Sequence, residues 1–233
     1  MVKAIVLAAG NGSRMKSSIK KQFIEINGLP LIVHTISQFE KSDVEEIILV
    51  TGKDEIDYCK ELVRLHAFSK VKDVISGGLE RYESVYKGLE YLSSNSCKSD
   101  IVMIHDGARP LVSVKLINKC IETMKDKKAI IVGVPVKDTI KIVDDANDVS
   151  ATPDRSRLWS IQTPQVFTYG LIKECYDKMQ KDIESGVVKP TDDSMVVEQY
   201  SDEKVRVIEG EYVNIKVTTP DDIELAAKYM NVK

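Results

Sequence analysis

The residues with the clearest chemical potential follow the first apolar run of the chain. Residues 4–9 have the length and the β-branched content of a buried strand. Gly10 and Gly12 come directly after this run, and the cations of Arg14 and Lys21 follow them. A strand, a glycine turn and fixed cations form the layout of a phosphate site, where backbone N–H groups and cationic side chains hold the anion. Arginine suits forked contact with phosphate oxygens, whereas lysine acts as a compact point charge.

The spacing of these residues differs from that of two common phosphate-binding motifs. A dinucleotide fingerprint would need glycine at position 15, where Met15 stands, and the spacing of a Walker loop does not occur. The pattern therefore predicts a phosphate site of another kind. An ordinary turn from strand to loop, with solvated cations, is the alternative interpretation.

The composition argues against several classes of partner. The chain has 233 residues, 43% of them hydrophobic, and a net charge of −3. That balance gives no bulk attraction to nucleic acid or to an anionic membrane, so an anionic ligand would depend on local cations. No apolar run reaches the roughly 18 residues of a membrane span, and the N-terminus lacks the apolar segment of a signal peptide. Four scattered cysteines without a C-x-x-C pair indicate a reduced, cytoplasmic protein with inert thiols.

Apolar runs and amphipathic segments alternate along the first 135 residues. After the first run, further strands are predicted at 46–51, 71–76, 100–105 and 129–134. Helices are predicted at 30–39, 53–66, 81–92 and 114–124, and a later one at 169–183. This alternation predicts an α/β, Rossmann-like fold in a single domain over residues 1–233, with a mostly parallel sheet and helices on both faces.

Small and charged residues gather where the predicted strands end. In such a sheet, ligands lie beyond the carboxyl ends of the strands. The candidates after the third and fourth predicted strands are Gly77, Gly78, Arg81, Ser84, Asp106 and Arg109. We expect these residues and the first glycine turn to share one pocket.

Residues 136–157, called the arm below, break the alternation. They are too polar for a core strand pair; Ile140 and Ile142 alternate with polar residues, and 144–150 is rich in turn residues. This pattern predicts a β-hairpin that protrudes from the body. Because an isolated two-stranded hairpin is marginally stable, we expect the arm to pair with a second copy of the chain. A merely flexible insertion is the alternative.

Two stretches near the C-terminus also carry candidate residues. Thr191 and the two aspartates after it precede a helical run to residue 200, so they either cap that helix or bind a ligand. Lys216 lies among apolar neighbours before Pro220, which suits the first turn of a final helix. Its ammonium is either solvated at a sheet edge or directed at a phosphate.

These blocks, taken in order, resemble one enzyme family along essentially the whole chain. The blocks are AAGNGSRM (8–15), KQ (21–22), GGLERYESV (77–85), HDGARP (105–110), PVKDTIK (135–141), DRSRLW (154–159), QTPQ (162–165), TDD (191–193) and NIKVTTP (214–220). Together they resemble the 2-C-methyl-D-erythritol 4-phosphate cytidylyltransferases. The ribitol-5-phosphate cytidylyltransferases share several blocks and form the alternative, but DRSRLW before QTPQ favours the first family.

The resemblance implies the transfer of a cytidylyl group from CTP to a sugar-alcohol phosphate, in which the acceptor phosphate attacks the α-phosphorus and pyrophosphate leaves. It implies catalytic roles for Arg14, Lys21 and Lys216. The CTP-binding residues that it implies are Ala8, Ala9, Gly10, Gly12, Gly77, Arg81 and Ser84. The acceptor-site residues that it implies are Asp106, Thr139, Arg155 and Arg109, although Arg109 could equally be a structural ion-pair partner.

The resemblance also implies a metal ion and a second subunit. Mg²⁺ would bridge the triphosphate oxygens, with Asp106 as a candidate ligand. The family's arm reaches across a homodimer, so Thr139 and Arg155 would complete the partner's acceptor site. This chain departs from the family pattern at Lys20, where proline is usual. The change adds a cation next to Lys21 and removes a restraint on the backbone.

Overall fold

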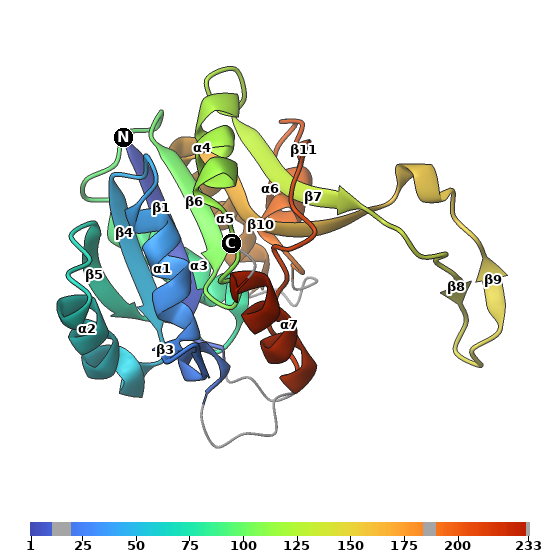
Figure 1. Cartoon of the computed structure of the whole chain (residues 1–233). Helices are drawn as coiled ribbons and strands as arrows, with labels where there is room; N and C mark the ends of the chain where they lie inside the picture. The colour runs from blue at the N-terminus through green and yellow to red at the C-terminus, as the bar shows by residue number, and fades with distance from the viewer. Residues whose placement is uncertain (11–19, 184–189, 232–233) are drawn as a thin grey trace.

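A seven-stranded sheet runs through the centre of the molecule, in the order β11-β7-β10-β6-β1-β4-β5 (Figure 1). The computed structural model describes residues 1–10, 20–183 and 190–231, so Gly12 and Arg14 lie outside the described residues. The strands of the sheet are β1 (Val2–Ala8), β4 (Glu46–Thr51), β5 (Val71–Ser76), β6 (Ile101–Asp106), β7 (Ala129–Pro135), β10 (Trp159–Thr168) and β11 (Arg206–Glu209). Two small strand pairs lie apart from it, namely β2 (Glu25–Ile26) with β3 (Leu29–Pro30), and β8 (Ile142–Val143) with β9 (Val149–Ala151).

Helices follow most of the strands, as the alternation predicts. They are α1 (Leu31–Glu40), α2 (Ile56–Leu65), α3 (Arg81–Leu92), α4 (Val114–Thr123), α5 (Tyr169–Ile183), α6 (Asp193–Tyr200) and α7 (Pro220–Asn231). Single 3-10 turns are η2 (Lys21–Phe23), η3 (Lys53–Glu55) and η4 (Arg155–Arg157). None of the helices in the described parts of the chain has the length and apolar character that crossing a membrane requires.

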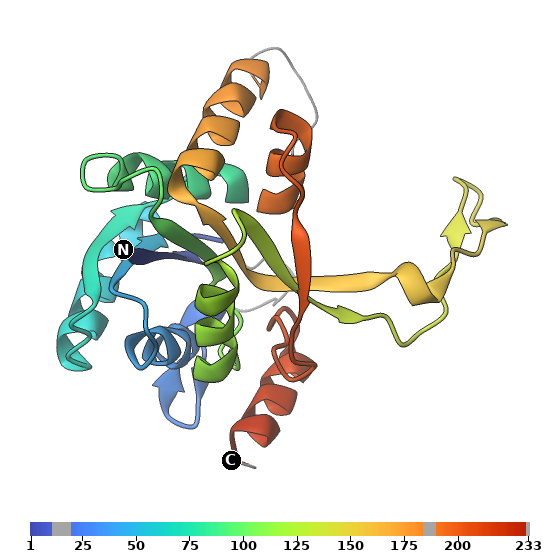
Figure 2. The ribbon, with the colours of Figure 1, turned by 90° about the horizontal axis from the view of Figure 1, so that it is seen from above.

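β1 lies at the centre of a parallel part of the sheet and is buried on both faces. It pairs in parallel with β4 on one side and with β6 on the other. Ala4 and Val6 pack in one core with side chains of α1, α2 and α4. Ile5 points the other way and packs in a second core with side chains of α3, α5 and α6. The two helix layers lie on opposite faces of the sheet (Figure 2), which confirms the predicted α/β architecture.

β10 adds an antiparallel strand that the sequence does not make obvious. It runs antiparallel to both β6 and β7, with an irregularity between Ile161 and Gln165 that contains a cis Thr163–Pro164 peptide bond. The sequence predicts that residues 158–162 and 163–165 rejoin the body, without assigning them to a strand of the sheet. Thr163 and Gln165 are buried in the sheet, so their polar groups must find partners inside the protein.

The arm protrudes from the body as a hairpin, as the sequence predicts (Figure 1). It leaves the sheet after β7, turns between β8 and β9, and returns through η4 into β10. Residues 137–152 are all exposed, including the apolar side chains of Ile142 and Val149.

The four cysteines are free; Cys59, Cys120 and Cys175 are buried, whereas Cys97 is exposed. Burial raises the pKa of the Cys59 thiol to about 11 and that of Cys120 to about 12. Both thiols are therefore protonated, and poor nucleophiles, at neutral pH.

Candidate active site

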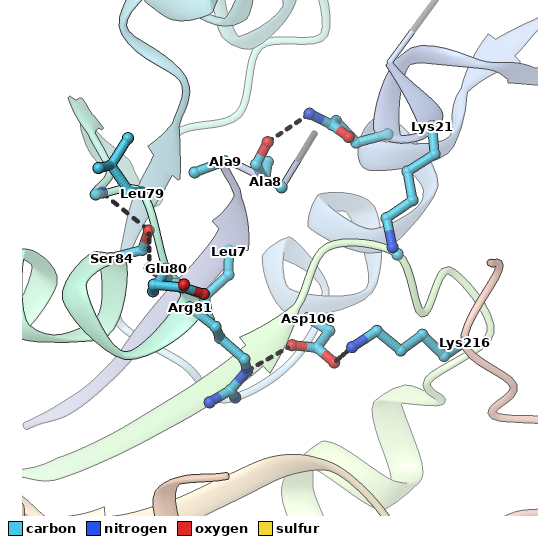
Figure 3. Close-up of a pocket in the computed structure, with 14 residues that line it drawn as sticks. Leu7, Ala8, Ala9, Lys21, Leu79, Glu80, Arg81, Ser84, Asp106 and Lys216 are labelled. Atoms are coloured by element: carbon cyan, nitrogen blue, oxygen red, sulfur yellow. Dashed lines mark hydrogen bonds and ion pairs between the residues drawn. The ribbon is translucent and has the colours of Figure 1, made fainter. Parts of the chain in front are cut away.

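A cavity lies at the carboxyl ends of β1, β5 and β6, where the sequence predicts a pocket (Figure 3). The predicted site residues that line it are Ala8, Ala9, Gly10, Lys21, Gly78, Arg81, Ser84, Asp106 and Lys216. They come from five separate segments of the chain. Lys21 and Lys216 therefore face one space, although they are far apart in the sequence. This placement favours the phosphate interpretation of Lys216 over a merely solvated edge position.

Asp106, the last residue of β6, is surrounded by cations. Its carboxylate lies 2.7 Å from Lys216 Nζ and 3.2 Å from Arg81 Nε, and the Nε of Arg109 is 3.9 Å away. Burial alone would raise the pKa of Asp106, but Arg81 and Lys216 lower it well below its ordinary value. Asp106 is therefore ionised across the neutral range and fixes the positions of the cations.

Arg81 begins α3, and its guanidinium is bound by two carboxylates of the protein. Its Nη1 and Nη2 donate to the two carboxylate oxygens of Asp193 at 2.9 and 2.7 Å, and Tyr176 Oη donates to Asp193 at 2.7 Å. Burial lowers the pKa of Arg81, but the two carboxylates raise it well above its ordinary value. The guanidinium thus connects Asp193 to Asp106, so the structure shows Arg81 engaged with protein carboxylates on the wall of the predicted CTP site.

The glycine turn before α3 forms another wall of the cavity. Ser84 Oγ accepts a hydrogen bond from Gly78 N at 3.0 Å. A Cβ atom on Gly77 would lie 2.6 Å from both Ala9 Cβ and Ser84 Oγ, so only glycine fits between them. The turn therefore packs directly against the end of β1.

Lys21 is the first residue of η2, and its neighbour Gln22 fastens this turn to β1. Gln22 is buried, and its Nε2 donates to Ala8 O at 2.6 Å. Figure 3 shows the Lys21 side chain extending from the turn toward the part of the cavity that holds Asp106 and Lys216. The first predicted loop and the C-terminal segment thus supply cations to the same place.

The segment around Lys216 is fixed by its neighbours. Asn214 is fully buried and donates from Nδ2 to Thr163 O at 2.9 Å, while Val217 N donates to Ala108 O at 2.8 Å. Arg109 Nη1 donates to Asn214 O at 2.9 Å. Arg109 therefore supports this segment, which fits the structural alternative considered for it, and it lines the neighbouring cavities.

Several buried polar residues support the site and were not singled out as site residues from the sequence. Thr163 Oγ1 accepts from Asp106 N and lies 3.1 Å from His105 Nδ1. Gln165 Oε1 accepts from the backbone N–H groups of Asp193 and Ser194. Thr163 and Gln165 belong to the QTPQ block, and Asp193 belongs to the TDD block. The sequence therefore identifies the motifs but not the hydrogen bonds between them.

Thr139 and Arg155 are not brought into this cavity. Both are exposed on the arm, and Arg155 Nη1 donates to Lys137 O at 2.9 Å. The arm extends away from the body that holds the cavity (Figure 1). Within one chain, the acceptor roles implied for these two residues therefore stay predictions.

A protein-built metal centre is not evident at the site. The described residues contain no group of three His, Cys, Asp or Glu side chains that could hold a metal ion. Each carboxylate oxygen of Asp106 already lies next to a cation of Lys216 or Arg81. A divalent cation would therefore depend chiefly on oxygens that a bound nucleotide brings, as Mg²⁺ commonly does.

A mostly parallel sheet with a cationic cavity at its carboxyl edge is the arrangement of an α/β nucleotidyltransferase. The sequence model of the 2-C-methyl-D-erythritol 4-phosphate cytidylyltransferase family matches residues 2–232. The chain belongs to this family.

Individual members of the family are similar to this chain along nearly their full length. The 2-C-methyl-D-erythritol 4-phosphate cytidylyltransferase of Clostridium beijerinckii is 49% identical over 231 residues, which cover 99% of this chain and 98% of the relative. The enzyme of the same name from Lachnospira eligens is 44% identical, with 97% and 98% covered. The crystal structure of 4-diphosphocytidyl-2C-methyl-D-erythritol synthase from Anaerococcus prevotii superimposes with a TM-score of 0.85 at 37% identity, covering 99% of this chain and 96% of that one.

Proposed function

We propose that this chain transfers the cytidylyl group of CTP to 2-C-methyl-D-erythritol 4-phosphate, giving 4-diphosphocytidyl-2-C-methyl-D-erythritol and pyrophosphate. The observation that carries this assignment is the convergence of Lys21 and Lys216 on one cavity with Asp106. The relatives described above are all named for methylerythritol phosphate or its cytidylyl product. The ribitol-phosphate alternative has no such support.

The chemistry requires positioning and charge stabilisation rather than a protein nucleophile. The acceptor phosphate attacks the α-phosphorus in line, the bond to the β-phosphate oxygen breaks, and pyrophosphate leaves. Both reactants are anions and repel each other. The ammonium groups of Lys21 and Lys216 reduce that repulsion and stabilise the charge that develops on the transferred group. Arg14, outside the described residues, would add a third cation.

Mg²⁺ remains part of the proposal as a companion of the nucleotide. When bound to the triphosphate, it neutralises charge and favours the departure of pyrophosphate. Asp106 instead holds Lys216 at 2.7 Å and Arg81 at 3.2 Å, so its contribution on the protein side is to keep these cations in place. A cytoplasmic location likewise remains an expectation, supported by the free cysteines.

The acceptor assignment is tested by a paired assay. Pyrophosphate release is measured with CTP and methylerythritol phosphate, and in parallel with CTP and ribitol 5-phosphate. We expect turnover with the first acceptor and little with the second. Preference for ribitol 5-phosphate would contradict the proposal, and so would CTP binding without turnover of either acceptor.

The arm supports a homodimer in which each subunit completes the other's acceptor site. Thr139 and Arg155 are exposed residues of the arm, and the arm extends away from the body (Figure 1), where a partner's site could receive it. A mixed dimer tests this, with Lys21→Ala in one subunit, Arg155→Ala in the other, and a different affinity tag on each. Arms acting in trans leave one working site of two. Arms acting in cis leave none, and a mixed dimer without activity would overturn the exchange.

A further inference from the structure

Lys20 stands next to Lys21 in the chain but does not share its surroundings. Lys21 lines the cavity, whereas the Nζ of Lys20 lies 2.6 Å from Oε1 of Glu55. Glu55 ends η3, the turn that follows β4 and precedes α2. The two neighbouring lysines therefore have different surroundings, and the Lys20 cation is directed at Glu55.

The ion pair occupies a space that the chain keeps open. Both side chains are largely buried, with 31% of Lys20 and 17% of Glu55 exposed. A Cβ atom on Gly52 would lie 1.9 Å from Glu55 Oε2 and 3.1 Å from Lys20 Nζ. The φ of Gly52 is −65°, which any residue adopts, so its glycine is needed here for space and not for backbone conformation. Within the described residues, Glu55 Oε2 has no hydrogen-bond partner, which leaves Lys20 to balance this carboxylate.

The ion pair is one of several attachments of the short segment that carries Lys21. On one side of Lys21, Lys20 is bound to Glu55; on the other, Gln22 is bound to the end of β1. Next along the chain, the Phe23 ring packs edge-to-face on Tyr58 of α2 with 5.1 Å between ring centroids. These attachments join the segment to the end of β1, to η3 and to α2.

We infer that the Lys20–Glu55 ion pair is a positioning device that holds the Lys21 ammonium in the cavity. The inference rests on the role of Lys21 in the proposed function. Charge stabilisation at a phosphoryl group depends on the placement of each cation, and a displacement of about 1 Å can cost on the order of a hundredfold in rate. Lys20 and Glu55 act through Lys21 and do not themselves contact the nucleotide.

Single and paired substitutions test this role. We expect Lys20→Ala and Glu55→Gln each to lower kcat/KM for CTP between about tenfold and a hundredfold, with a larger effect on kcat than on KM. The charge exchange Lys20→Glu with Glu55→Lys rebuilds the pair in reverse and should recover most of the loss. A Lys20 that contacted the triphosphate directly would give no recovery in the exchanged protein, and that result would overturn the inference.

Gly52→Ala tests the same pair without removing a charge. Its new methyl group must displace the flexible end of Glu55, so kcat/KM for CTP should fall in the same direction while the urea midpoint stays near that of the wild type. Asp54→Asn is the matched control, because it removes an exposed carboxylate from the same turn. Wild-type protein without turnover would refute the proposed function. Normal turnover in Glu55→Gln and Gly52→Ala would refute the positioning role alone.

Discussion

Asp106 holds the cations of the cavity in place, and this gives the first prediction. Replacing it with asparagine keeps the shape but removes the negative charge between Lys216 and Arg81. Lys216 then loses its carboxylate partner and is repelled by Arg81, which Asp193 still holds in place. We expect Asp106→Asn to lower the rate of pyrophosphate release on the order of a hundredfold or more. Glu122→Gln, which removes an exposed ion-pair partner of Lys125, is the control. Activity within a few-fold of wild type would contradict the role given to Asp106.

His105 makes the stability of the protein depend on pH. Burial lowers the pKa of its imidazole from 6.5 to about 3, with Thr163 and Arg109 O as neighbours of the ring nitrogens. Below pH 6.5 the imidazole of His105 is protonated in the unfolded chain, whereas in the folded chain it stays neutral down to about pH 3. The free energy of unfolding should therefore fall as the pH drops through this window, by about 2 kcal/mol between pH 7 and 5.

Urea unfolding at pH 7 and pH 5 measures this dependence. His105→Gln should be less stable than the wild type at pH 7, because its side chain fits the buried site less well. Its loss of stability between the two pH values should nevertheless be smaller by about 2 kcal/mol. Equal losses in the two proteins would show that His105 is not the group responsible.

The predicted and observed bounds of the helices and strands show which features can be predicted from the sequence. β4, β5, α3 and α5 match their predicted bounds residue for residue, because apolar periodicity is a local property of these segments. The sequence of β10 lacks such a regular apolar pattern. Its buried centre contains Gln165, whose amide is satisfied by Asp192, Asp193 and Ser194 from a distant segment. From the sequence alone, a polar residue such as Gln165 is assigned to the surface, because its buried hydrogen-bond partners are distant in the chain.

The same limit applies to the site. Its edge of the sheet could be predicted, because the carboxyl ends of parallel strands lie together. The pairing of Arg81 with Asp193, 112 positions along the chain, could not, because nothing local to either residue indicates the other. The Lys20–Glu55 contact is of the same kind. Sequence patterns therefore predict where the pocket lies. The structure is needed to show which of its charged residues face the cavity and which bind other protein groups.

The start of α6 connects helix stability to the site. Asp192 is its N-cap and accepts from Met195 N at 2.9 Å, and the next residue, Asp193, binds Arg81. The capping alternative considered for this stretch thus applies to Asp192. We expect Asp192→Ala to lower the free energy of unfolding by about 1 kcal/mol or more. It should also raise the KM for CTP, because Asp193 loses its fixed position.

Glu198→Ala provides the comparison for this prediction. Glu198 is exposed on the same helix and takes no part in the cap. Urea unfolding and CTP kinetics are measured on both variants. If Asp192→Ala is no less stable than Glu198→Ala, the cap contributes nothing measurable and the proposed link between α6 and Arg81 loses its basis.

In the folded chain as a whole, the arm is the part whose exposed apolar side chains are not covered by the body. Its two short strands expose Ile142, Val143 and Val149, which are 52, 48 and 59% exposed. A hairpin of this size is marginal on its own, and apolar side chains gathered at an exposed tip are typical of an interface. In the proposed homodimer, a second copy of the chain would cover these side chains.

A charge on the arm should therefore disrupt assembly and activity together. In Val149→Asp, a carboxylate would have to be buried at the proposed interface, which is unfavourable without a partner. We expect light scattering to show more monomer than in the wild type at equal concentration, and the specific activity to fall on dilution. The body should keep its urea midpoint, because Val149 lies outside both sheet cores. Leu65→Asp places the same charge on an exposed apolar position of α2 and should leave the dimer intact. If Val149→Asp stays dimeric and fully active, the arm cannot be the element that joins the subunits.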